Sequence, residues 1–117
     1  MKGTSLAPSA VGLLGLARRA GAVAPGIEAV RRAIQTGQAR LVLTAEDASR
    51  VQLDKIRKAM RDRAIPQVTL GDRDALGASV GTAPLAAVAI TNGSFADRIR
   101  AELEGSTNEG SQEDVEA

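Results

Sequence analysis

Apolar positions that recur three or four residues apart predict five amphipathic helices along the chain. The apolar positions of four of these helices are Leu13, Leu14, Ala17 and Ala20; Ile27, Val30, Ala33 and Ile34; Leu53, Ile56 and Met60; and Phe95, Ile99 and Leu103. The fourth helix in chain order is a short one, expected at Arg73–Ser79. Gly21 and Gly37 are expected to end the first two helices. Asp47, Asp72 and Ser94 precede the other three and are the expected N-caps, because their side-chain oxygens can accept hydrogen bonds from free N–H groups of the first turn.

Four shorter segments between these helices have the character of strands. Residues 39–44 and 85–91 are nearly unbroken apolar runs, which indicates strands covered on both faces. A short strand is expected at residues 67–70, after Pro66, and a very short one around residues 22–24. The sequence therefore predicts an α/β protein, a three-layer α-β-α sandwich whose mixed sheet has about four strands and carries helices on both faces.

Composition limits the chemistry of the chain. Its 117 residues suffice for one domain with one sizeable core, expected over residues 1–105. There is no Cys and no His, which excludes disulfides and thiolate metal sites and removes the commonest general base. We therefore expect a non-enzymatic protein without metal or cofactor. No apolar run reaches the roughly 20 residues needed to span a bilayer, so we expect a cytoplasmic protein without membrane contact.

The net charge of +1 conceals a strong asymmetry. Residues 1–63 contain twelve Lys or Arg and five Asp or Glu, whereas residues 64–117 contain three and nine. Residues 106–117 hold four acids, no base and a single Val, too little apolar surface to offset the entropy of ordering, and they are expected to form a disordered acidic tail. Without these four charges the rest of the chain carries +5, which is typical of nucleic-acid binding but also of ordinary solvated surface.

The second predicted helix has the pattern of a phosphate-binding element. Gly26 opens it, and Arg31 and Arg32 follow on its first turns. Backbone N–H groups at a helix start have no intrahelical partner, and beside guanidinium groups they suit phosphate. The alternative is that Gly26 serves only a tight turn into the helix.

The order and spacing of several motifs resemble a known family. The motifs are LLGLARRAG (residues 13–21), GIEAVRRAI (26–34), LVLTAED (41–47), IPQVTLG (65–71), ALGASVG (75–81) and AAVAI (86–90). They resemble the kink-turn RNA-binding ribosomal protein family that includes the L-seven-Ae and L-thirty-e proteins, and within it the bacterial YlxQ-type branch. The resemblance covers about residues 9–103 and implies the α/β fold and structured RNA as the partner.

The resemblance places the RNA grip at the start of the second helix. The family typically has Gly, any residue, Asn and Glu there, with Lys three residues later; this chain has Gly26, Ile27, Glu28, Ala29 and Arg32, with Arg31 as a further cation. An Asn amide both donates and accepts hydrogen bonds, whereas an ionised Glu28 only accepts and would repel phosphate. Ala29 has no polar side-chain atom. The resemblance thus implies a backbone and cationic grip that positions RNA, with a changed base readout.

Two further regions are implied by the resemblance. One is the loop Thr82, Ala83, Pro84 and Leu85, whose apolar side chains would pack against a flipped-out nucleotide; alternatively Leu85 begins the strand and Pro84 stiffens the turn. The other lies around Ser49 and Leu53.

The basic residues 55, 57, 58, 61 and 63 are expected to be a solvated helix face, with wider phosphate contact as the alternative. Glu46 and Asp47 resemble a paired-carboxylate metal or acid–base site, but the interpretation that we favour is that Asp47 caps the third helix.

We therefore expect a non-catalytic RNA-binding protein of the translation or ribosome-assembly machinery. Its partners would be structured RNA, ribosomal or otherwise non-coding, and proteins of that machinery. The alternative is a protein-interaction module that has lost kink-turn recognition, in keeping with the replacement of Asn and Glu at the grip. An enzyme is the third alternative and would have to act with Asp and Glu carboxylates alone.

Overall fold

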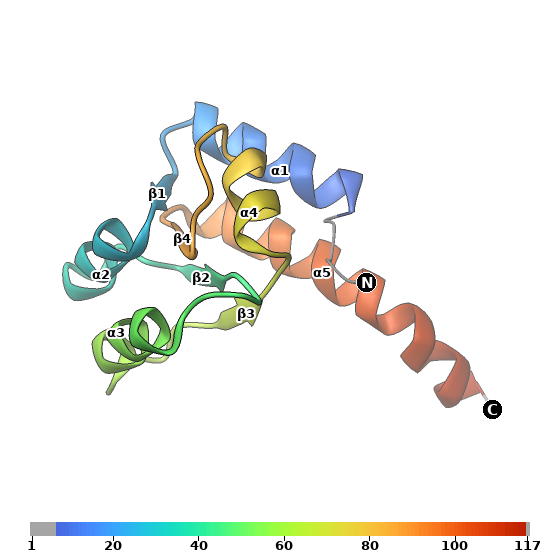
Figure 1. Ribbon diagram of the computed structural model, residues 1–117. Coiled ribbons are helices and arrows are strands. Elements are labelled where there is room, and N and C mark those ends of the chain that lie inside the picture. The colour runs from blue at the N-terminus through green and yellow to red at the C-terminus, as the bar shows by residue number, and fades with distance from the viewer. Residues whose placement is uncertain (1–6, 117) are drawn as a thin grey trace.

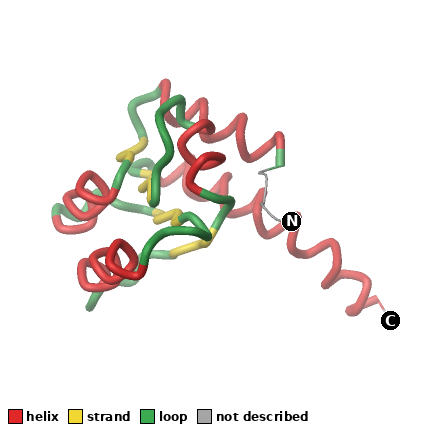
Figure 2. Tube along the Cα trace, in the orientation of Figure 1, coloured by secondary structure: helices red, strands yellow, loops and turns green. Residues whose placement is uncertain are grey.

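Helices and strands alternate along residues 7–116, the part of the chain that the computed structural model describes, with side chains described up to residue 104. The elements are α1 (Pro8–Arg19), β1 (Val23–Pro25), α2 (Ile27–Gln35), β2 (Leu41–Thr44), α3 (Arg50–Met60), β3 (Gln67–Thr69), α4 (Arg73–Ser79), β4 (Ala87–Ile90) and α5 (Gly93–Glu116) (Figures 1 and 2). The predicted succession of elements is confirmed. The strands are shorter than the apolar runs that predict them, because Leu85 and Ala86 precede the first β4 ladder pair.

The four strands form one mixed sheet in the order β1-β4-β2-β3. Strand β4 is antiparallel to both neighbours, with Val23 opposite Ile90 and Val42 opposite Ala89. Strand β3 is the outermost strand on one side of the sheet and is parallel to β2, with Leu43 opposite Val68. This confirms the predicted mixed sheet.

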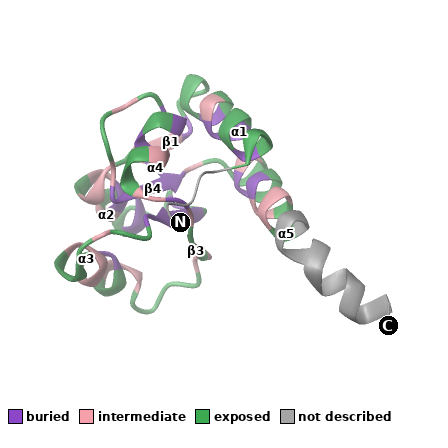
Figure 3. Cartoon of the chain, turned by 45° about the vertical axis from the view of Figure 1, so that its right-hand side comes forward, coloured by how far each residue is buried: buried purple, intermediate pink, exposed green. Residues whose placement is uncertain are grey.

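Alternate residues of the central strands pack into two separate helical layers. Leu41, Leu43, Val88 and Ile90 belong to a cluster with residues of α1, α4 and α5, whereas Val42, Ala87 and Ala89 join residues of α2 and α3. Helices α2 and α3 therefore cover one face of the sheet and α1, α4 and α5 the other, so the three-layer sandwich is confirmed (Figures 1 and 3). All residues of β2 and β4 are buried, which explains why their sequences lack the alternation of half-exposed strands.

The caps of the helices differ in part from the expected ones. Asp72 caps α4 as predicted, accepting from the Ala75 N–H at 2.8 Å. Asp47 does not cap α3; the cap is Ser49, because the chain makes another turn after β2 before the helix begins. Ser94 lies inside α5, and Asn92 accepts from the Phe95 N–H at 3.0 Å instead.

The helix trace of α5 continues beyond the last predicted apolar position, Leu103, to Glu116. The side chains of residues 105–116 and all of residue 117 lie outside the described part of the chain, so the predicted disorder of residues 106–117 stays a prediction. Within the described part, no helix is long and apolar enough to cross a membrane.

Candidate nucleic-acid interface

One edge of the sheet gathers the residues that the sequence predicts as RNA contacts. Strands β1 and β2 end at this edge and β4 begins there, since Pro25 lies opposite Val88 and Thr44 opposite Ala87. Strand β3 runs parallel to β2 and ends there too. The starts of α2, α3 and α4 and the loop of residues 82–85 therefore surround the same edge, although they are far apart in the sequence.

Gly26 ties the start of α2 to this edge. Its N–H donates to the Ala87 carbonyl at 2.8 Å, and its φ of 96° with ψ of 157° is a conformation that essentially only glycine adopts. A Cβ added here would meet Leu85 Cδ2 at 3.8 Å, so the loop and the helix start lie side by side. Among the described side chains none caps α2, which leaves its first N–H groups available to an anion. The backbone conformation of the turn therefore requires this glycine, whereas the contact with Leu85 would leave room for a Cβ.

The two predicted cations of α2, Arg31 and Arg32, differ in their contacts and in their position along the helix. Arg31 Nη1 contacts Glu28 Oε1 at 2.9 Å, and its side chain is 35% exposed. Helix α2 has only nine residues, so Arg32 belongs to its last turn, where its side chain is exposed. Because a helix rises about 1.5 Å per residue, Arg32 sits roughly 8 Å along the axis from the first residue. The expectation that both arginines lie on the first turns is wrong for Arg32.

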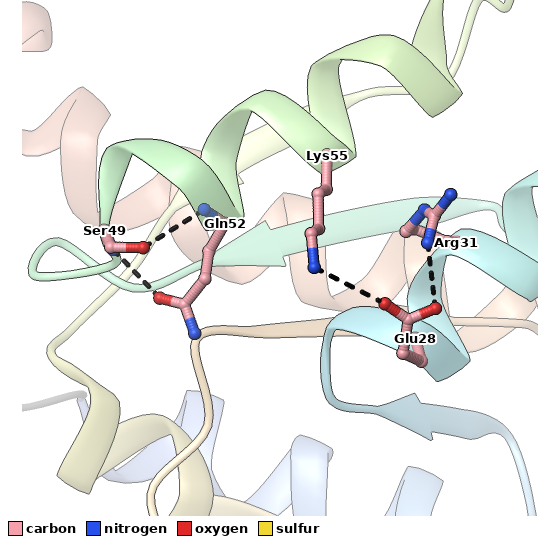
Figure 4. A network of polar contacts seen from close by, with 5 residues as sticks. All are labelled: Glu28, Arg31, Ser49, Gln52 and Lys55. Carbon is pink, nitrogen blue, oxygen red and sulfur yellow. Dashed lines mark hydrogen bonds and ion pairs between the residues drawn. The ribbon is translucent and has the colours of Figure 1, made fainter.

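Glu28 also contacts the neighbouring helix. Its Oε2 lies 3.9 Å from Lys55 Nζ on α3, while its Oε1 faces Arg31 (Figure 4). The carboxylate thus bridges cations of two helices that pack together on the same face of the sheet. Lys55 was expected to lie on a solvated helix face, with phosphate contact as the alternative; its contact with Glu28 was not predicted, because it depends on how α2 and α3 pack.

The start of α3 is held by a reciprocal cap. The Gln52 N–H donates to Ser49 Oγ at 3.1 Å, and the Ser49 N–H donates to Gln52 Oε1 at 2.9 Å (Figure 4). Ser49 is exposed at the predicted edge but serves the helix, and Leu53 is half-buried. Asp47 accepts from the Arg73 N–H at 2.9 Å and lies 3.5 Å from Arg73 Nε, so its carboxylate ties α4 to the end of β2.

The loop of residues 82–85 is pressed against α4. The Thr82 N–H donates to the Gly77 carbonyl at 2.9 Å, and the Leu85 N–H donates to the Arg73 carbonyl at 3.1 Å. Ala83 and Pro84 are exposed, whereas Leu85 is half-buried against the core. The exposed apolar surface of this loop is therefore that of Ala83 and Pro84.

Gly77 permits this close packing. A Cβ added to it would lie 2.2 Å from the Ala83 carbonyl oxygen and 2.9 Å from Pro84 Cα. The sequence offers a hint in a glycine placed inside a seven-residue helix, where it costs stability relative to alanine. What the glycine contacts follows only from the tertiary structure.

A basic hollow lies between the outer sides of α2 and α3. It measures about 250 Å³ and is lined by Arg31, Gln35, Lys55, Lys58 and Ala59. Its lining holds cations and an amide but no carboxylate, which suits an anion. The hollow follows the middle and later turns of α2 and α3, so it extends away from the starts of these helices.

Comparison with known proteins identifies a family and a relative. The model of the ribosomal protein L7Ae/L30e/S12e/Gadd45 family matches residues 9–99. The RNA-binding protein YlxQ of Bacillus subtilis (strain 168) is 36% identical over 87 residues, which are 74% of this chain and 87% of that protein.

Solved structures share the architecture. A protein of unknown function from Bacillus halodurans superimposes with a TM-score of 0.75 at 29% identity, covering 81% of this chain and 96% of that one. The 15.5kD RNA binding protein of Giardia lamblia superimposes with a TM-score of 0.65 at 22% identity, covering 81% and 84%. The latter likeness concerns the fold alone.

Proposed function

The chain belongs to the ribosomal protein L7Ae/L30e/S12e/Gadd45 family, and we propose that it is a non-catalytic RNA-binding protein of the translation or ribosome-assembly machinery. In this proposal the edge of the sheet at the start of α2 grips structured RNA, ribosomal or otherwise non-coding. The name of the Bacillus subtilis relative supports RNA as the partner class.

The observation that carries the proposal is the meeting of three kinds of contact at one edge. The start of α2 offers N–H groups without a side-chain cap among the described residues. Arg31 and Lys55 supply positive charge near it, and Arg32 adds charge on the last turn of α2. Ala83 and Pro84 are exposed in the loop whose Leu85 lies beside Gly26. Phosphate, ribose and an unstacked base are the parts of RNA that such a combination accommodates.

The alternative function is a protein-interaction module on the same fold. Its supporting observation is Val51, which is 65% exposed on the first turn of α3 beside the candidate edge. An exposed apolar side chain of that size gives a partner protein something to cover. Binding of RNA with a strong salt dependence separates the two, because phosphate contacts release counterions and an apolar protein contact does not.

The proposal is tested by fluorescence anisotropy with a labelled kink-turn RNA, measured over a range of salt concentrations. Replacing Arg31 and Arg32 together by alanine should weaken binding and flatten the slope of log affinity against log salt by about one unit for each lost phosphate contact. The matched control replaces Arg98 and Arg100 by alanine, since these lie on α5 in the opposite layer. That control should leave the slope unchanged.

Two results would contradict the proposal. One is a wild-type protein that binds neither the kink-turn nor a duplex RNA of equal length at low salt. The other is a folded Arg31/Arg32 variant whose affinity and salt slope equal those of the wild type, because the cations of α2 would then make no contact with phosphate.

A further inference from the structure

Glu28 stands where an anionic ligand would be expected. Its two carboxylate oxygens each face a different cation, Arg31 at 2.9 Å and Lys55 at 3.9 Å, and these cations come from different helices (Figure 4). The same two cations line the basic hollow between α2 and α3, which continues to Lys58. The carboxylate therefore contacts two of the three cations that line the hollow, and the described lining includes no acid.

This carboxylate is held only loosely. The Glu28 side chain is 67% exposed, and Lys55 is 49% exposed. Exposed ion pairs contribute little to stability, because water screens them and long side chains lose freedom in forming them. Glu28 can therefore turn into solvent at small cost and leave both cations to another anion.

We propose that Glu28 occupies a phosphate site in the free protein and is displaced when RNA binds. The inference rests on the proposed function, since the displacing group is a phosphodiester of the bound RNA. Two non-bridging oxygens of a phosphate would replace the two carboxylate oxygens, with a hydrogen bond from the Arg31 guanidinium and a charge contact from Lys55. The RNA backbone would continue along the hollow past Lys58.

The consequence is a filter against weakly bound polyanions. Every phosphate that enters the site must compete with Glu28, so an RNA that contacts only this site gains little. An RNA that also contacts the start of α2 and the loop of residues 82–85 has enough further contacts to displace the carboxylate. Glu28 thus contributes to specificity by competing with polyanions that contact this site alone. An amide at this position would contribute through hydrogen bonds to the bases.

Glu28→Gln distinguishes a carboxylate that competes with RNA phosphate from one that contacts RNA itself. Loss of a competitor strengthens RNA binding, whereas loss of a contact weakens it. The substitution keeps the shape of the side chain and removes its charge. A displaced competitor predicts tighter RNA binding, about fivefold at low salt, which corresponds to one ion contact about 4 Å long in water that RNA no longer has to break. The salt slope should also steepen by about 0.7–0.9 units, since the site would then carry one more positive charge.

The matched control is Glu104→Gln. Glu104 lies on α5 in the opposite layer, pairs with Arg100 at 3.6 Å and is 62% exposed, so it resembles Glu28 in exposure and in having an arginine partner on its own helix. Its replacement removes the same charge. Measured beside Glu28→Gln at about 0.15 M salt, it should change RNA affinity by less than about twofold, because a charge farther from the RNA than the Debye length of about 8 Å is screened. Equal effects of the two substitutions would overturn the inference in favour of net charge alone.

Lys55→Gln provides the second measurement. In the wild type it should weaken RNA binding only slightly, whereas in the Glu28→Gln variant, where Lys55 is released, the loss should be several-fold larger. Unchanged or weaker RNA binding by Glu28→Gln overturns the inference while leaving the proposed function intact, provided that the wild type binds RNA. A wild type that binds no RNA overturns both.

Discussion

Replacing Gly77 by alanine should destabilise the protein, although alanine is the better helix former. Gly77 lies inside α4, and its neighbours across the contact are backbone atoms of the loop of residues 82–85. The added Cβ would lie 2.2 Å from the Ala83 oxygen and 2.8 Å from the Ala83 carbonyl carbon. Backbone atoms cannot rotate away as a side chain does, so the loop or the helix must shift as a whole.

The size of the effect follows from these distances. An oxygen at 2.2 Å must retreat by about 1 Å to reach an ordinary contact, which places Gly77→Ala near the upper end of small-to-large substitutions, about 3 kcal/mol. The higher helix propensity of alanine raises the free energy of unfolding by about 1 kcal/mol. The net loss of unfolding free energy is therefore about 2 kcal/mol, which corresponds to a melting temperature lower by about 8–16 °C in a domain of this size.

Thermal and urea unfolding followed by circular dichroism measure this effect. Gly12→Ala is the matched control, because Gly12 lies inside α1 and no atom of the described residues lies within 4 Å of its added Cβ. This control should raise stability by up to about 1 kcal/mol. If Gly77→Ala also raises stability, the loop does not pack against α4 as described, and the position of Ala83 and Pro84 at the candidate edge loses its support.

The remaining predictions concern RNA readout and the acidic tail. Restoring the family residues by Glu28→Asn with Ala29→Glu should strengthen kink-turn binding by roughly 1–3 kcal/mol for each well-placed base contact, measured by gel shift; tight kink-turn binding by the unmodified chain at physiological salt would show that Glu28 replaces the amide. Deleting residues 106–117 removes four negative charges, so RNA association should become faster at low salt in stopped-flow measurements. The same deletion should leave the melting temperature nearly unchanged, because the tail is expected to bury little; strong amide-exchange protection across residues 108–116 would contradict its disorder.

The pattern of apolar residues suffices to predict the architecture. Leu41 and Val42 point to opposite faces of the sheet, yet both are buried, and only helices on both faces explain such a run. Asp72 was predictable as a cap because it immediately precedes a compact helical segment. Local sequence carries this information, since strands and caps depend on neighbouring residues.

Features that depend on how elements pack were not predictable in the same way. Asp47 was expected to cap α3, but the chain turns once more after β2, so Ser49 is the cap. The contact of Glu28 with Lys55 requires the relative placement of α2 and α3. Resemblance to a family indicated which residues to expect at a candidate RNA site, but not that the Glu28 carboxylate contacts cations of two helices.

The central claim is that RNA binds at the edge formed by the start of α2, the start of α3 and the loop of residues 82–85. Amide chemical-shift mapping of the ¹⁵N-labelled full chain, titrated with a kink-turn RNA at low salt, tests it most directly. We predict shifts concentrated at residues 26–32, 49–58 and 82–86, with α1 and α5 nearly unaffected. Shifts centred on α1 and α5, or no shifts at saturating RNA, would contradict the account.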